Sequence, residues 1–200
     1  MNDLIGQHLE KWTENKSGQE ALIAVFTHVR DIPYSVRPEL NHPAHYQRIL
    51  EFNAGSCTPK HLLLAEMFRR LGRDVLLAVY PYRWAEFEDL YPPPLWKLAQ
   101  TMPPGSHLAC KVFINGRDVL VDATIDPPLG RIGLPVNASW DGQSDTLLPV
   151  LATGEEVIYH PSEALLMPPP QLDDGVLAFY RGLNDYFDKI RQDRPGAGPG

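Results

Sequence analysis

Three side chains in this sequence have the types and order of a nucleophilic acyl-transfer site: Cys57, His107 and Asp122. Cys57 follows Gly55-Ser56 and directly precedes TPKHLLLAEMFRRL, so its sulfur is expected at a helix N-terminus. Backbone N–H groups and the helix dipole favour the thiolate at such a position, and the same N–H groups would stabilise an oxyanion. The alternative is a buried thiol that packs as a small hydrophobic residue, and the position at a helix start favours the nucleophile.

A predicted β-hairpin brings His107 and Asp122 together. HLACKVFI and RDVLVDAT flank the Asn-Gly dipeptide at 115–116, which supplies the positive φ angles that a two-residue type I′ turn requires. A turn centred there pairs Ala109 with Asp122, so that His107 and Asp122 become diagonal neighbours on one face of the sheet. A loop of odd length would place Asp122 on the opposite face. The same alternation puts Cys110 on the other, apolar face, where it is expected to pack in the core.

The other elements follow from periodicity, capping signals and turn residues. The helix predicted over 58–71 is apolar around most of its circumference, which indicates a central helix buried on several sides. The segment YQRILEFNAG fits a helix or a strand. The remaining predictions are a short helix around residues 4–12, a helix over 17–32 opened by a Ser17/Glu20 capping box, a strand over 74–82, a Pro-rich loop before the hairpin, a possible strand over 155–160 and a closing helix over 175–192.

This order of helices, then strands, then a closing helix indicates an α+β fold. The 200 residues suffice for one domain with a full hydrophobic core. We therefore expect a single domain over residues 1–191 and a flexible Pro/Gly-rich tail over residues 192–200.

Composition excludes several classes of partner. The net charge of −7 and the pI of about 5.4 leave no basic stripe for nucleic acid. The N-terminal residues lack the apolar segment of a secretory signal, and no stretch approaches the roughly 20 apolar residues that span a bilayer. We expect a cytoplasmic protein without a membrane partner, in which both cysteines are free thiols. The oligomeric state is not predicted.

Three segments resemble the motifs of transglutaminase-like enzymes. GSCTPKHLLLAEMFRRLGRDV (55–75) is similar to the cysteine motif, in which Gly-x-Cys opens a long apolar helix that ends at Leu-Gly before a strand. HLACKVFINGRDVLVDAT (107–124) resembles the second and third motifs, a His that begins one strand and an Asp that ends the next. VRDIPYSV (29–36) resembles the stretch that precedes the Cys in many members. The resemblance spans residues 20–128, and the order Cys, His, Asp agrees.

The resemblance implies a papain-like core, in which the Cys helix packs against an antiparallel sheet that carries His107 and Asp122. It implies that Cys57 attacks a carboxamide or ester, that His107 is general base and acid, and that Asp122 orients His107. The acyl group would then pass to an amine or to water, with a peptide, a protein or a small amide as substrate. Papain-type enzymes often place an oxyanion-binding Gln before the Cys. That Gln is absent here, and Asn53 is either its substitute or a turn residue.

Other functions compete with this interpretation. Arylamine N-acetyltransferase-like chemistry shares the order of the triad, although the chain is short for that family. A transglutaminase-like module retained for binding, with a poorly activated triad, is a third alternative. Aromatic residues after the strand at 74–82 form either a substrate wall or core: Tyr80, Tyr82 and Trp84.

Metal binding is the least favoured alternative. Cys57, His61, His107 and Cys110 superficially resemble a zinc site, but Cys110 should point away from His107. His61 is better explained as a hydrogen-bonded helix histidine than as a residue that lines the site. No metal and no cofactor are therefore expected.

Overall fold

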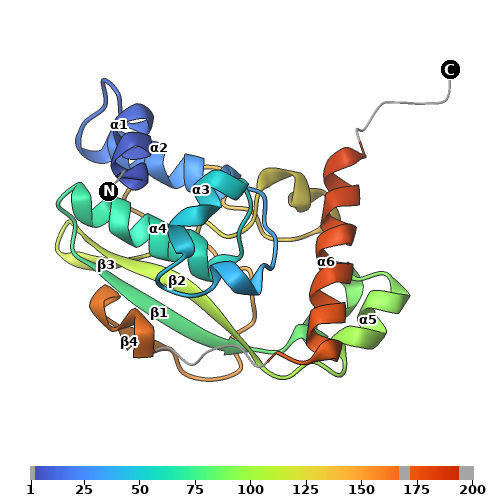
Figure 1. Cartoon of the computed structure of the whole chain (residues 1–200). Coiled ribbons are helices and arrows are strands. Elements are labelled where there is room, and N and C mark those ends of the chain that lie inside the picture. Colours follow the sequence, from blue (N-terminus) through green and yellow to red (C-terminus); the bar gives the residue numbers. More distant parts are fainter. Residues whose placement is uncertain (1–2, 167–171, 194–200) are drawn as a thin grey trace, which may run out of the picture.

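The computed structural model describes residues 3–166 and 172–193, which form an α+β fold (Figure 1). A four-stranded antiparallel sheet has the strand order β3-β2-β1-β4, and α4 lies across one face of it with α1 and α2 above. No helix in the described part of the chain is both long and apolar enough to cross a bilayer. The helices and strands are α1 (Leu4–Trp12), α2 (Gly18–Asp31), α3 (Ile49–Phe52), α4 (Cys57–Arg70), β1 (Val75–Tyr82), α5 (Pro93–Ala99), β2 (Gly105–Ile114), β3 (Arg117–Val121), β4 (Val157–Tyr159) and α6 (Asp174–Gln192).

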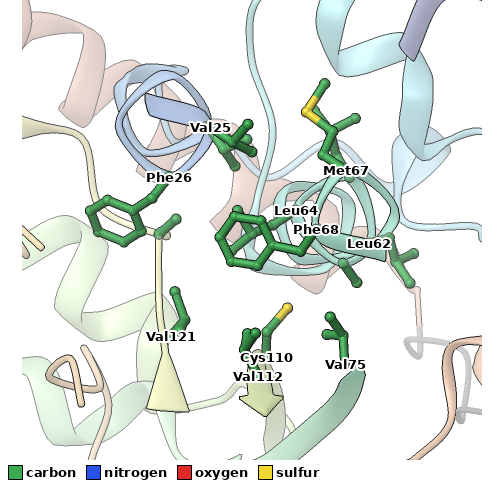
Figure 2. Close-up of a cluster of buried hydrophobic side chains, with 14 of the residues drawn as sticks. Val25, Phe26, Leu62, Leu64, Met67, Phe68, Val75, Cys110, Val112 and Val121 are labelled. Carbon is green, nitrogen blue, oxygen red and sulfur yellow. The ribbon is translucent and has the colours of Figure 1, made fainter. Parts of the chain in front are cut away.

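Helix α4 is the centre of the main hydrophobic core. Phe68 on this helix is fully buried, as are Val25 and Phe26 of α2 on one side and Cys110 and Val112 of β2 on the other. Figure 2 shows these side chains converging between α4, α2 and the sheet. The prediction of a central helix buried on several sides is therefore confirmed.

The hairpin has the predicted register. Ile114 pairs with Arg117 and Cys110 pairs with Val121, so the loop contains only residues 115 and 116. Asn115 and Gly116 have φ angles of 52° and 84°, as a type I′ turn requires. Asp122 consequently follows the end of β3 on the face predicted for it.

Two local predictions were wrong. Ser17 occupies the N-cap position of α2, but its side chain makes no capping hydrogen bond, and a backbone bond from Glu20 to Ser17 opens the helix instead. The Pro-rich segment before the hairpin is not a loop. It contains a 3₁₀ helix, η3 (Trp84–Leu90), followed by α5, which begins at Pro93 because proline is compatible with the first turn of a helix.

The structure also resolves the ambiguous segment 46–55 and the start of the expected tail. The ambiguous segment 46–55 forms a 3₁₀ turn, η2 (Tyr46–Arg48), and the short helix α3. Gln192, assigned to the expected tail, ends α6, and residues 194–200 lie outside the described residues.

Helix α6 is fixed to the chain next to the start of α4 by polar side chains. Asn184 both donates to and accepts from the backbone of Val36, at 3.0 and 2.8 Å. Arg191 makes a two-point ion pair with Asp126, at 2.9 and 2.8 Å, and donates to the carbonyl of Tyr34. Because Asp126 is 2% exposed, this ion pair is shielded from water. The end of α6 is thereby anchored beside the residues that follow β3.

Lys60, in the first turn of α4, hydrogen-bonds to the backbone of three other residues. Its fully buried Nζ donates to the carbonyls of Arg30, Ile32 and Thr124, at 2.9, 2.9 and 2.7 Å. Burial lowers the pKa of the Lys60 amine to about 7, and nearby carboxylates act in the opposite direction. Three acceptors use all three protons of an ammonium group, so the charged form is the one that this site holds.

Replacing Lys60 should therefore destabilise the fold. Lys60→Met keeps the length of the side chain but leaves three buried carbonyl oxygens without a donor, each worth about 1–3 kcal/mol. We expect the free energy of unfolding in urea to fall by at least about 3 kcal/mol. Lys97→Met, at an exposed position of α5, is the matched control and should be near neutral. Equal stability of the two variants would contradict this role of Lys60.

Candidate active site

The three side chains predicted to act together lie where α4, β2 and β3 meet. Cys57 is the first residue of α4, His107 lies in β2 opposite Tyr80 of β1, and Asp122 directly follows β3. Cys57, His107 and Asp122 are 8%, 3% and 1% exposed. Nε2 of His107 and Oδ2 of Asp122 are 2.5 Å apart. The diagonal relationship inferred from the hairpin register thus becomes a direct hydrogen bond.

The other ring nitrogen of His107 is available to Cys57. Because Nε2 is bound to Asp122, Nδ1 is the ring nitrogen left to interact with Cys57, and hydrogen bonding between the two side chains shifts the pKa of each. The backbone of Leu108 makes a second hydrogen bond to the Cys57 sulfur. Asp122, His107 and Cys57 form a continuous hydrogen-bonded chain, in which a carboxylate fixes the tautomer and orientation of a base.

Electrostatic interactions along this chain favour an ionised thiol. Burial opposes ionisation of Cys57, but the hydrogen bond and positive charge of His107 outweigh burial and lower the pKa of the thiol. Burial also disfavours the charged ring of His107, whereas the charge and hydrogen bond of Asp122 raise the pKa of His107 to about 10. The pKa of Asp122 is lowered because the positive charge of His107 outweighs its burial. The interactions along this chain therefore favour the ionised forms of the three groups: a thiolate, an imidazolium and a carboxylate.

The start of α4 leaves backbone donors beside the sulfur. Ser56 is the N-cap residue, yet its hydroxyl donates to Oδ1 of Asn41 at 2.8 Å and does not cap the helix. Among the described residues, the amides of Cys57 and Thr58 have no hydrogen-bond acceptor. Two such N–H groups at a helix N-terminus suit a developing oxyanion.

Asn53, the candidate substitute for the missing oxyanion-binding Gln, occupies a turn. It has a left-handed backbone conformation, with φ 46° and ψ 44°, is exposed, and ends α3. Of its two sequence interpretations, the turn residue is the one that the structure supports.

The turn after Asp122 is held by residues that the sequence did not identify. The Asp122 N–H donates to Oγ1 of Thr146 at 2.7 Å, and its carbonyl accepts from Nδ2 of Asn137 at 2.9 Å. Oδ1 of Asp122 accepts the N–H of Thr124 at 2.9 Å. Thr146 and Asn137 lie in a turn-rich segment without periodicity, so no sequence signal links them to the site.

Three tyrosines interact electrostatically with Cys57. Tyr34 and Tyr82 are 8% and 5% exposed, and burial together with the negative charge of Cys57 and neighbouring tyrosines raises their pKa values well above the ordinary range. Burial and the charge of Cys57 also raise the pKa of Tyr180 on α6. Tyrosine side chains from three segments therefore lie within electrostatic reach of the thiol.

The three aromatic residues expected to form a wall have different surroundings. Tyr82 interacts electrostatically with the Cys57 thiol, and the ring of Trp84 packs edge-on against the ring of Tyr82, with centroids 5.0 Å apart. Trp84 also contacts Phe179 of α6 at 5.0 Å and thus belongs to a second hydrophobic core. Tyr80 donates to Oε2 of Glu156 at 2.5 Å, and Glu156 is also paired with Lys111.

Cys110 has a structural environment. It is fully buried, its Sγ donates to the carbonyl of His61 at 3.4 Å, and burial raises the pKa of its thiol. Figure 2 shows its sulfur directed towards α4, within the core. In the part of the chain that the structure describes, no three His, Cys, Asp or Glu side chains are grouped to hold a metal ion.

Comparisons with family models, with curated proteins and with solved structures gave no match to this chain. The residues of the site, their spacing and their geometry are therefore the basis for assigning a function.

The ion pair predicts a specific pH dependence for the reactivity of Cys57. A thiol with a lowered pKa stays ionised above that pKa and is protonated as the pH falls through it. Wild-type Cys57 should therefore react with iodoacetamide well below the ordinary thiol pKa of about 8.5. His107→Gln should lose this advantage, with a rate that falls roughly tenfold per pH unit below about 8.5. Both proteins should carry Cys110→Ala, so that only one thiol reacts. Superimposable pH profiles would contradict the ion pair.

Proposed function

We propose that the chain is a transglutaminase-like cysteine enzyme with a papain-like core, which transfers an acyl group or hydrolyses an amide of a peptide, a protein or a small molecule. The observation that carries this proposal is the hydrogen-bonded series from Asp122 through His107 to Cys57 at the start of a buried helix. A buried thiolate with an adjacent imidazolium and free backbone amides is the arrangement of an activated nucleophile.

In the first half of the proposed reaction, Cys57 is acylated. The thiolate attacks the carbonyl carbon of the substrate, a C–S bond forms, and the carbonyl oxygen becomes an oxyanion beside the amides of Cys57 and Thr58. The imidazolium of His107 then gives its proton to the leaving amine as the C–N bond breaks. The products of this half-reaction are a free amine, a thioester on Cys57 and a neutral His107.

In the second half, an amine or a water molecule attacks the thioester. His107 now accepts a proton from the attacking group, and the C–S bond breaks to regenerate the thiolate of Cys57. Asp122 remains ionised throughout and stabilises the imidazolium each time it forms. The acceptor decides whether the outcome is acyl transfer or hydrolysis.

The tyrosines next to Cys57 support a second candidate of the same chemical class. Tyr34, Tyr82 and Tyr180 give the site an aromatic border, which suits a small apolar acyl group or an aromatic amine. An enzyme similar to arylamine N-acetyltransferases would acylate Cys57 from a thioester donor such as acetyl-CoA. Acylation by acetyl-CoA in preference to amides would favour this candidate.

Intact-mass spectrometry tests the acyl-enzyme. Incubation with p-nitrophenyl acetate should add one acetyl group to Cys57 of the wild-type protein, because the thiolate is activated and the ester is a reactive acyl donor. His107→Ala should slow the acylation by roughly 10²–10⁴-fold, the usual contribution of a general acid–base residue. Subsequent addition of a primary amine should remove the acetyl group.

Two control variants test whether the acetyl group is attached to Cys57. Cys57→Ser should remain unmodified under the same conditions, and Cys110→Ala should behave as wild type because Cys110 is buried in the core. A wild-type protein that is acylated no faster than His107→Ala would instead indicate a binding module with an inactive triad.

A further inference from the structure

His61 connects the nucleophile to the residue that follows the acid. It lies one helical turn after Cys57 on α4 and is fully buried. Nδ1 of its ring is 2.9 Å from the carbonyl oxygen of Cys57, and Nε2 is 3.0 Å from the backbone nitrogen of Ala123. One side chain thus spans from the backbone of Cys57 to the backbone next to Asp122.

The two contacts of His61 fix its tautomer. A carbonyl oxygen can only accept a hydrogen bond and a backbone N–H can only donate one. Nδ1 must therefore carry the proton and donate to Cys57, while Nε2 is unprotonated and accepts from Ala123. A second ring proton, on Nε2, would point at the N–H proton of Ala123 and repel it. Burial lowers the pKa of His61 to about 4, in agreement with a neutral ring.

This tautomer leaves the carboxylate free for the base. Oδ2 of Asp122 lies 4.0 Å from Nε2 of His61 and 2.5 Å from Nε2 of His107. Because Nε2 of His61 carries no proton, it does not compete with His107 as a donor to Asp122. Its contact with Ala123 still holds the peptide next to the carboxylate in place.

Lys60 completes the attachment at the next residue. Its ammonium group binds the carbonyl of Thr124, while His61 binds the N–H of Ala123. Consecutive residues of α4 therefore hold consecutive residues after Asp122. The distance between Cys57 and Asp122 is consequently controlled by the helix that carries the nucleophile.

We infer that His61 is a positioning residue, which fixes Asp122 relative to Cys57 through its acceptor contact with Ala123. This role rests on the proposed function in one respect, namely that Cys57, His107 and Asp122 act as a unit. It assigns to His61 no contact with the substrate and no transfer of a proton.

Two conservative substitutions separate the two contacts of His61. His61→Gln places an amide oxygen near the position of Nε2 and can accept from Ala123, whereas His61→Asn places an amide near Nδ1 and keeps only the contact with Cys57. Each variant retains one hydrogen bond of the pair, so their stabilities should fall by similar amounts. Met67→Ala, further along the same buried helix, reports the effect of destabilisation alone.

The readout is the proton that His107 shares with Asp122, observed by NMR as a strongly downfield resonance. We expect this resonance in the wild-type protein, His61→Gln and Met67→Ala, and its loss in His61→Asn. The rate of alkylation of Cys57 near neutral pH should change in parallel with this resonance. We expect the rate to fall at least roughly tenfold in His61→Asn only, because small displacements of catalytic groups have large effects on rate.

Persistence of the resonance in His61→Asn, its absence from the wild-type protein, or equal loss in the Asn and Gln variants would overturn the inference. Failure of the proposed function is distinguishable from these outcomes. In that case the resonance would follow the expected order among the variants, while p-nitrophenyl acetate would leave Cys57 unmodified in the wild-type protein.

Discussion

A carboxylate that is 1% exposed requires donors and positive charge around it, and Asp122 draws these from several segments of the chain. His107 of β2 and the N–H of Thr124 bind its two oxygens, and the ammonium group of Lys60 on α4 interacts with its charge. The imidazolium that Asp122 stabilises in turn stabilises the thiolate of Cys57. The negative charge of one buried carboxylate thus favours the ionised forms of His107 and Cys57.

Helix α4 determines the geometry of that site. It presents Cys57 at its first residue and, one turn later, Lys60 and His61, which bind the backbone on the far side of Asp122. Its apolar surface packs between α2 and the sheet, so these groups are carried on a rigid element. Arg191 of α6 fixes the same region from another direction through Asp126.

The sequence predicted the parts of the molecule whose causes are local. The Asn-Gly turn determined the hairpin register, and with it the approach of His107 to Asp122, because Asn-Gly strongly favours a two-residue type I′ turn. The helix predicted over 58–71 agrees with α4 (Cys57–Arg70) to within one residue at each end. The helix α5 was missed because consecutive prolines suggested a loop, although proline is compatible with the first turn of a helix.

The partners of the site could not be predicted, because they come from distant positions without a pattern. Arg191 is 65 residues from Asp126, and Thr146 is 24 residues from Asp122. The most direct measurement of the central claim is the thiolate absorbance of the Cys110→Ala protein, titrated against pH with Cys57→Ser as the blank. An ionised Cys57 paired with His107 predicts a thiolate signal that persists well below the ordinary thiol pKa of about 8.5 and shifts to that range in Asp122→Asn. Titration near about 8.5 in both proteins would contradict it.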